Sequence, residues 1–202
     1  MKIDGDLNLI LPITFDDNGE PILYAYHTPI GQPVFEANYR ILAATKAALF
    51  GKGLVFAADV GPRIAALRLE DEGKQDALER GDVDQDGNPR DGGTASLLLE
   101  IKRLTSILSP GPQGWQMLPV DTAISQKIID TADWEDALNS LVFFTCAYAL
   151  AKRHTRKNLT SALAGILKGS ITSLAPLEYC DSLQKSTNQE TSELKAVSSV
   201  PV

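Results

Sequence analysis

A long apolar segment in the second half of the chain places the strongest constraint on the fold. Residues 133–154 are predicted to form the longest helix, because their large apolar side chains recur at helical spacing and form a broad face. These side chains are Trp134, Leu138, Leu141, Val142 and Phe144. The most apolar part, residues 141–150, is interrupted by Thr145 and followed by a basic cluster. It is far shorter than the roughly 20 residues of a membrane-spanning helix, so a soluble protein is predicted.

Further helices are predicted wherever apolar residues recur at spacings of three and four. They cover residues 33–50, 61–69, 94–108, 121–129 and 158–169. The helix that begins at Gly61 is expected to end at the polar run 70–73. The helix of residues 94–108 is expected to end at Ser109-Pro110-Gly111-Pro112, and residues 114–119 are predicted to form an extended connector.

A β-hairpin is predicted at the front of the chain, over residues 7–28. Residues 7–11 and 21–26 have strand character, and Asp16-Asp17-Asn18-Gly19 between them supplies residues that tolerate a positive φ. Two strands alone are marginally stable in water. The hairpin is therefore expected to pack on a helix or to pair with another chain.

The predicted fold class is mainly α, a helical domain with an N-terminal β-hairpin and a disordered C-terminal tail. The 202 residues, 44% of them hydrophobic, suffice for one packed core. Residues 1–30 form the hairpin, residues 31–170 the helical domain, and residues 171–202 a polar, flexible tail. Few large apolar side chains lie in residues 186–202, so that segment is predicted to be dispensable for folding.

Composition excludes several classes of partner and compartment. The net charge of −7 and the sequence pI of about 4.8 disfavour nucleic acid and anionic membranes as partners. The polar N-terminus does not resemble a signal peptide, so a cytoplasmic protein is expected. Cys146 lies in an apolar run and is interpreted as a small buried hydrophobe, and no disulfide with Cys180 is expected.

The sharpest local motif is Asp82-Val83-Asp84-Gln85-Asp86-Gly87. Alternating carboxylates followed by glycine match the first half of an EF-hand calcium loop. The second half fails, because position twelve of such a loop is Gly93 and position eight is Pro89. The segment is interpreted as a solvated acidic loop, without a calcium site.

No other catalytic or cofactor-binding constellation is found, and the sequence predicts no catalytic, cofactor-binding or metal-binding residue. His27 and His154 are far apart and lack neighbouring ligands spaced for zinc. A Ser-His-Asp site could form across distance, but no Gly-x-Ser-x-Gly elbow is present. Trp134 is expected in the core, whereas Trp115 fits either the core or an interface.

The order of segments resembles a family of tail assembly proteins from long-tailed phages and prophages of Gram-negative bacteria. The resemblance covers residues 1–186 and is carried by segments without catalytic character. These are Met1-Lys2-Ile3-Asp4-Gly5-Asp6-Leu7-Asn8-Leu9, Gly61-Pro62-Arg63-Ile64-Ala65-Ala66-Leu67, Ile101-Lys102-Arg103-Leu104-Thr105, Gly114-Trp115-Gln116-Met117-Leu118-Pro119, Asn139-Ser140-Leu141-Val142-Phe143-Phe144-Thr145 and Thr172-Ser173-Leu174-Ala175-Pro176-Leu177-Glu178-Tyr179. Residues 82–93 look like an insertion in this pattern.

This resemblance implies a non-catalytic chaperone in the host cytoplasm. Such a chaperone would bind the long, apolar, helical tape-measure protein, help recruit tail-tube subunits and self-associate. Two alternatives remain open. One is a structural tail component of connector or terminator type, which needs more strands than are predicted. The other is a metal-dependent enzyme that uses Asp82, Asp84 and Asp86.

Overall fold

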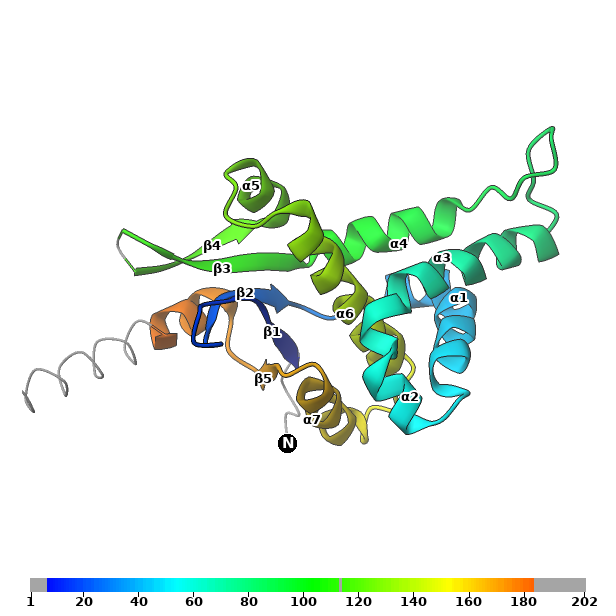
Figure 1. Ribbon diagram of the computed structural model, residues 1–202. Coiled ribbons are helices and arrows are strands. Elements are labelled where there is room, and N and C mark those ends of the chain that lie inside the picture. The colour runs from blue at the N-terminus through cyan, green and yellow to red at the C-terminus, as the bar shows by residue number, and fades with distance from the viewer. Residues whose placement is uncertain (1–6, 113, 184–202) are drawn as a thin grey trace, which may run out of the picture.

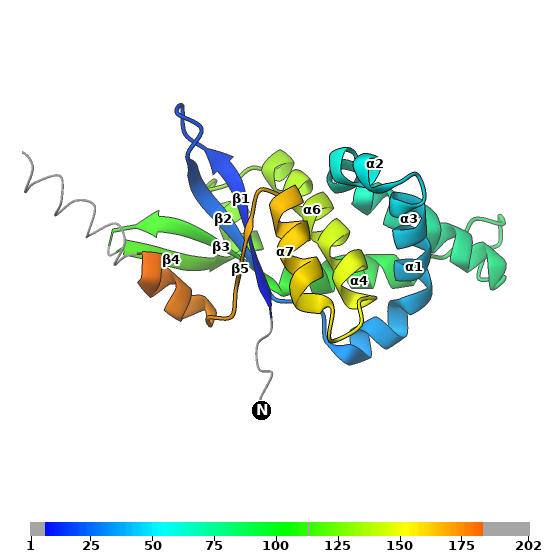
Figure 2. The same cartoon turned by 90° about the horizontal axis from the view of Figure 1, so that it is seen from below.

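The computed structural model of this chain describes residues 7–112 and 114–183 (Figure 1). Its strands are β1 (Asn8–Phe15), β2 (Pro21–His27), β3 (Thr105–Gly111), β4 (Gly114–Pro119) and β5 (Ser170–Thr172). Its helices are α1 (Gln32–Phe50), α2 (Leu54–Asp59), α3 (Gly61–Glu79), α4 (Gly92–Arg103), α5 (Val120–Ser125), α6 (Thr131–Ala149), α7 (Arg156–Ile166) and a last helix over residues 176–183. The strands lie on one side of the molecule and most of the helices on the other (Figure 2).

The predicted N-terminal hairpin is confirmed, but it belongs to a larger sheet. β1 and β2 pair antiparallel, with Leu9 opposite His27. The sheet has five strands in the order β4-β3-β2-β1-β5, and every neighbouring pair is antiparallel. The prediction of a mainly α fold with a single hairpin is therefore wrong, and the protein mixes helices with an antiparallel sheet.

The missed strands lie where a helix and a connector were expected. The helix predicted over residues 94–108 ends at Arg103, and β3 begins at Thr105. Leu104, Ile107 and Leu108 continue the helical spacing of apolar residues, which made this segment read as helix. In the structure Ile107 instead lies opposite Ala25 of β2 and is fully buried. Pairing with a distant strand overrides local periodicity here.

The predicted connector of residues 114–119 is β4, which forms a second hairpin with β3. Leu108 lies opposite Met117, and Gly111 lies opposite Gly114. The β3–β4 hairpin extends beyond the rest of the sheet (Figure 1).

Helix α3 is longer than predicted, because it passes through the polar run 70–73 and ends at Glu79. Its buried side after the first turns consists of Leu69, Gly73 and Ala77, spaced four residues apart. A Cβ atom at Gly73 would lie 2.0 Å from Oγ1 of Thr94 and 2.2 Å from Oδ2 of Asp91. The glycine thus lets the start of α4 pack closely on α3. The continuation of the helix was missed because Gly73 and Ala77 are small residues.

The first part of the predicted flexible tail is ordered. Ser170–Thr172 forms β5 on the free edge of β1, and residues 176–183 form a helix. The hydroxyl of Tyr26 donates a hydrogen bond of 2.8 Å to the carbonyl oxygen of Leu174 between them. The predicted dispensable segment, residues 186–202, lies outside the described residues.

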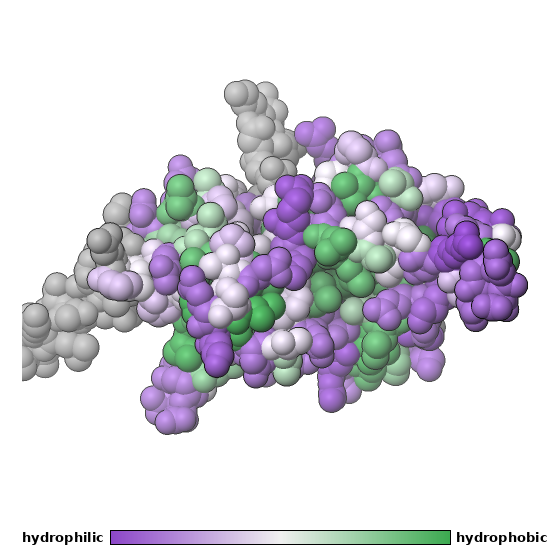
Figure 3. All heavy atoms as spheres, turned by 90° about the horizontal axis from the view of Figure 1, so that it is seen from above, coloured by the Kyte–Doolittle hydropathy of each residue, from purple (hydrophilic) through white to green (hydrophobic). Residues whose placement is uncertain are grey.

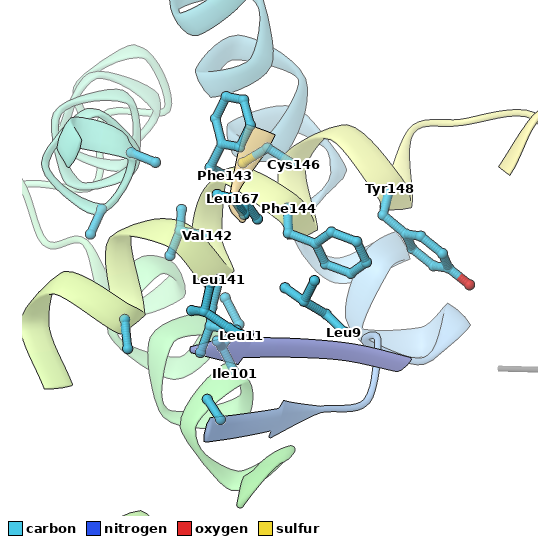
Figure 4. Packing of buried hydrophobic residues seen from close by; sticks show 14 of the residues in the cluster. Leu9, Leu11, Ile101, Leu141, Val142, Phe143, Phe144, Cys146, Tyr148 and Leu167 are labelled. Carbon is cyan, nitrogen blue, oxygen red and sulfur yellow. The ribbon is translucent and has the colours of Figure 1, made fainter. Parts of the chain in front are cut away.

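The predicted central helix is present as α6, which lies at the middle of the main core, but it spans Thr131–Ala149 and ends before the predicted residue 154. It begins with a capping box in which the side chain of Asp130 accepts from the N–H of Asp133 and the side chain of Asp133 accepts from the N–H of Asp130. Leu141, Phe143 and Phe144 are fully buried. Leu141 and Phe144 point toward Leu11 and Leu9 of β1 (Figure 4), whereas Phe143 stacks on Phe50 of α1. Trp134 is also buried, as predicted.

A second, smaller cluster covers the other face of the sheet. Ile10, Tyr26 and Leu108 of the sheet pack there with Cys180 of the 176–183 helix. Cys146 lies in the main cluster, so the two cysteines belong to different clusters and both are free. Burial raises the pKa of the Cys146 thiol to about 12, which agrees with its predicted role as an inert core residue.

Candidate functional site

A groove between α1 and α4 forms an apolar recess on the surface. Its volume is about 440 Å³. The first turns of α1 line one side and the middle of α4 lines the other. The lining residues are Pro33, Val34, Ala37 and Asn38 of α1 with Ser96, Leu97, Leu99, Glu100 and Arg103 of α4. At its rim Glu100 accepts two hydrogen bonds of 2.7 Å from Arg103, which holds the pKa of this carboxyl below its ordinary value.

A second hollow of about 320 Å³ adjoins the groove through Ala37 and Asn38. Its walls come from α1, the end of α3 and the start of α4. Arg40 and Arg80 both bind Asp76, at 2.8 and 2.9 Å. The positive and negative side chains compensate each other here, so this hollow offers neither a dedicated anion site nor a dedicated cation site.

Large apolar side chains at this recess point to solvent. Leu99 is 66% exposed in the groove, and Tyr39 is 54% exposed beside it. Exposed apolar side chains that flank a recess and are rimmed by polar residues are typical of binding surfaces. The exposed apolar side chains of this recess can bind an apolar partner.

One sequence feature, a run of three leucines, indicates this surface but is not explained by helical spacing alone. Leu97, Leu98 and Leu99 follow one another on α4, and a helix cannot turn three consecutive residues to one face. Leu97 is buried, Leu98 is half-buried and Leu99 is exposed. Leu97 belongs to the core, which could be predicted from its spacing. Leu99 belongs to the surface, which the sequence analysis did not consider.

The acidic motif lies in a tight turn at the end of a loop that extends away from the helices (Figure 1). Oδ1 of Asp84 accepts the N–H groups of Asp86 and Asn88 at 2.9 and 2.8 Å, and Oδ2 accepts the Asn88 side chain at 3.1 Å. These bonds lower the pKa of Asp84. Val83 and Pro89 form an isolated antiparallel bridge across the turn. The Asp84 carboxylate is thus engaged in shaping the backbone.

The same turn occurs twice in the chain. Asp16-Asp17-Asn18-Gly19-Glu20-Pro21 and Asp84-Gln85-Asp86-Gly87-Asn88-Pro89 share aspartate, glycine and proline at the same positions. In both, the first Asp accepts the N–H groups two and four residues later. The two glycines have φ angles of 83° and 82°. A comparison of the two segments would have indicated that residues 84–89 form a hairpin-like turn, rather than the first half of an EF-hand loop.

We expect calorimetric titration of the full chain with calcium to show no saturable heat at micromolar concentration. The reason is that Asp84 already bonds to the turn, and Gly93 supplies no side-chain oxygen to close a calcium loop. Within the described ranges, no group of three or more His, Cys, Asp or Glu side chains is arranged to hold a metal ion. A micromolar isotherm that disappears in Asp84→Ala would contradict this expectation and support the metal-enzyme alternative.

The two histidines lie in unrelated environments and do not form a joint site. His27 is fully buried in the sheet, whereas His154 is exposed after α6. Nδ1 of His27 lies 2.9 Å from Oγ1 of Thr105, whose hydroxyl donates to the carbonyl of Ile101. The Thr105 hydroxyl donates its proton to the carbonyl oxygen, so it can only accept from His27. Nδ1 of His27 therefore carries the imidazole proton and donates it to Oγ1 of Thr105. Nε2 is then a buried acceptor that has no hydrogen-bond partner within residues 7–112 and 114–183.

Trp115 is half-buried on the outer face of the sheet, with its ring 5.7 Å from that of Tyr24.

Comparisons with known proteins find no matching family model, no similar curated protein and no similar solved structure. None of the helices in residues 7–112 and 114–183 combines the length and hydropathy that a membrane crossing requires. A function is therefore inferred from the groove together with the resemblance in the sequence.

Proposed function

We propose that this chain is a non-catalytic phage tail assembly chaperone that holds apolar helical segments of a tape-measure protein in the groove between α1 and α4. The exposed apolar lining of this groove, centred on Leu99, is the observation that carries the proposal. The segments that resemble tail assembly proteins supply the class of partner. The host cytoplasm is the compartment in which such assembly takes place.

A helix fits this groove by a known mode of recognition. An amphipathic helix places its apolar residues, spaced three and four apart, into a recess between two helices of its partner. The groove offers apolar walls, and its rim carries the Glu100–Arg103 ion pair and Asn38. A recess of this size holds only a short stretch of helix. Many copies would therefore coat a long tape-measure chain, and each copy would be released as tail-tube subunits arrive.

The proposal is tested by co-expression with the tape-measure protein of the same phage genome. The wild-type chain is expected to raise the soluble fraction of the tape-measure protein and to co-purify with it. Leu99→Glu should abolish both effects, because it places a charge in the apolar groove. Leu177→Glu is the matched control, since Leu177 is 67% exposed and lies outside the groove.

Two outcomes would reject the proposal. One is that the wild-type chain neither solubilises nor binds the tape-measure protein. The other is that Leu99→Glu and Leu177→Glu behave alike, which would show that the groove is not the binding surface. Thermal unfolding of both variants establishes that they remain folded.

The five-stranded sheet favours one alternative, a structural tail component of connector or terminator type. Too few predicted strands counted against that alternative, and the structure removes this objection. Mass spectrometry of purified particles separates the two functions. A chaperone is absent from mature particles, whereas a connector or terminator is present at constant stoichiometry.

A further inference from the structure

The tip of α2 is a second apolar surface on this protein, which the proposed function does not use. It consists of Leu54 and Val55 in the first turn of α2, which are 77% and 86% exposed. No other large apolar side chain in residues 7–112 and 114–183 is exposed to this extent. We propose that this tip inserts into the groove between α1 and α4 of a second copy of the chain, so that copies join head to tail and cover the groove until a tape-measure segment displaces the tip.

Backbone contacts hold the tip in one shape. Gly53 turns the chain between α1 and α2 with a φ of 99°, a conformation that favours glycine. Its N–H donates a hydrogen bond of 3.0 Å to the carbonyl oxygen of Phe50, and its own carbonyl oxygen accepts one of 3.0 Å from the N–H of Ala57. Helix α2 also packs on α1 and α3. An apolar surface that is already formed loses little conformational freedom when it binds.

The tip of one copy does not reach the groove of the same copy. The groove lies at the first turns of α1, up to Asn38, whereas the tip follows the end of α1 at Phe50. Roughly 18 Å of helix separates Asn38 from Phe50. Figure 2 shows α2 at the far end of α1 from the point where α1 begins. A contact between tip and groove therefore joins two copies, and such a heterologous contact continues as a row or closes into a ring.

The groove has the size and the lining that the tip requires. Its volume of about 440 Å³ exceeds that of one leucine and one valine side chain together. Val34, Leu97 and Leu99 contribute to its walls. Insertion of the tip would remove Leu54, Val55 and Leu99 from water at a single contact, which is the main favourable contribution to association.

The charges near the two surfaces have opposite signs. Residues 46–63, which contain the tip, include three basic residues and one acidic residue, a net charge of +2 in a chain of net charge −7. Residues 70–91 include nine acidic and three basic residues, a net charge of −6. This acidic segment leads into α4, and Figure 3 shows its end of the molecule as a hydrophilic surface.

This distribution of charge selects the head-to-tail contact over the other contacts between copies. Asp91, the N-cap of α4, precedes Ser96 of the groove by roughly 8 Å along the helix axis. The acidic segment thus begins within the range of about 10 Å over which exposed charges interact. A tip in the groove brings a basic surface to an acidic one, whereas two tips or two grooves in contact would bring like charges together.

The inference rests on the proposed function in one respect, that the groove is also the site for tape-measure segments. The tip and the segment then compete for the same apolar walls. Association between copies would keep Leu99 covered before the tape-measure protein is present, and would be reversed when it binds. The contact between copies itself does not require that function.

Sedimentation equilibrium of the full chain tests the contact. The weight-average mass is expected to rise with concentration beyond that of a dimer, with a Kd on the order of 10 μM because the interface is small. Val55→Glu removes the tip and Leu99→Glu removes the groove, so each should raise the Kd at least about tenfold. Leu177→Glu is the control that should associate like the wild type, because Leu177 is exposed but belongs to neither surface.

A mixture of the two defective variants gives the sharpest result. Val55→Glu retains its groove and Leu99→Glu retains its tip, so an equimolar mixture should form a complex of two chains and nothing larger. A mixture that remains monomeric would overturn the proposal. It would also be overturned by a wild-type chain that stays monomeric well above 10 μM in concentration, or by association that neither substitution weakens.

Co-expression with the tape-measure protein separates this inference from the proposed function. Val55→Glu should solubilise the tape-measure protein at least as well as the wild type, because its groove is intact and no tip competes for it. Copies that associate through tip and groove without solubilising the tape-measure protein would support this contact and reject the chaperone function. A monomeric chain that solubilises it through the groove would do the reverse.

Discussion

The folded protein is expected to lose stability steadily as the pH falls from about 6.5 to about 4.5, by on the order of 1 kcal/mol per pH unit. The cause is His27, which is fully buried. Burial lowers the pKa of its imidazole from 6.5 to about 3. Between these two values the unfolded chain binds a proton that the folded chain excludes, so acid favours unfolding. Above about pH 6.5 the imidazole is neutral in both states and its contribution no longer changes.

Denaturant unfolding at several pH values measures this slope. His27→Phe removes the titrating group and should flatten the dependence between about pH 6.5 and about pH 4.5. His154→Gln is the matched control, because His154 is exposed and its replacement should preserve the slope. The pKa values of Asp16, Asp84 and Glu100 are lowered by hydrogen bonds, so their own stabilising contributions are lost only at lower pH. An unchanged slope in His27→Phe would show that another group is responsible.

Gly169→Ala is expected to destabilise the protein by roughly 2–3 kcal/mol. A Cβ atom at this position would lie 2.5 Å from the carbonyl oxygen of Ile10 in β1. That oxygen belongs to the backbone of a paired strand, and Ile10 lies opposite Ser170 at the start of β5. The strand cannot move aside without losing its pairing, so β5 must separate from β1. The thermal midpoint should fall by roughly 5–10 °C in a chain of this length.

The neighbouring Gly165 provides the control for this substitution. It lies in α7 and is exposed, and a Cβ atom there would contact nothing within 4 Å. Gly165→Ala should stabilise the protein by about 0.5–1 kcal/mol, because alanine is the better helix former. If both variants lose stability equally, the loss at position 169 is not due to contact with β1.

Elements that depend on nearby residues were predicted well. The β1–β2 hairpin follows from Asp16 and Gly19, whose turn is made by side-chain and backbone hydrogen bonds within a few residues. Helix α6 follows from the helical spacing of its apolar side chains. In both cases the stabilising contacts lie along the same stretch of chain, so the amino-acid order contains them.

Elements that depend on distant residues were not predicted. Residues 105–108 have helical spacing, but they pair with β2, which lies much earlier in the chain. The polar run 70–73 continues α3 because Gly73 packs against Asp91 and Thr94. Residues 176–183, which were read as flexible, form a helix that covers apolar side chains of the sheet. A strand completes its hydrogen bonds, and a short helix buries its side chains, only when the partner is in place.

The candidate site shows the same division. The absence of a catalytic motif in the sequence pointed to binding, and the leucines of α4 were visible as an apolar run. The groove itself exists only because α1 and α4, distant in sequence, lie side by side and leave Leu99 exposed between them. The amino-acid order thus determined the turns, the central helix, the apolar segments and the uneven distribution of charge. Tertiary structure alone decided that residues 105–111 and 114–119 became strands, and which apolar segments were covered or stayed exposed, because burial and strand pairing are properties of two segments together.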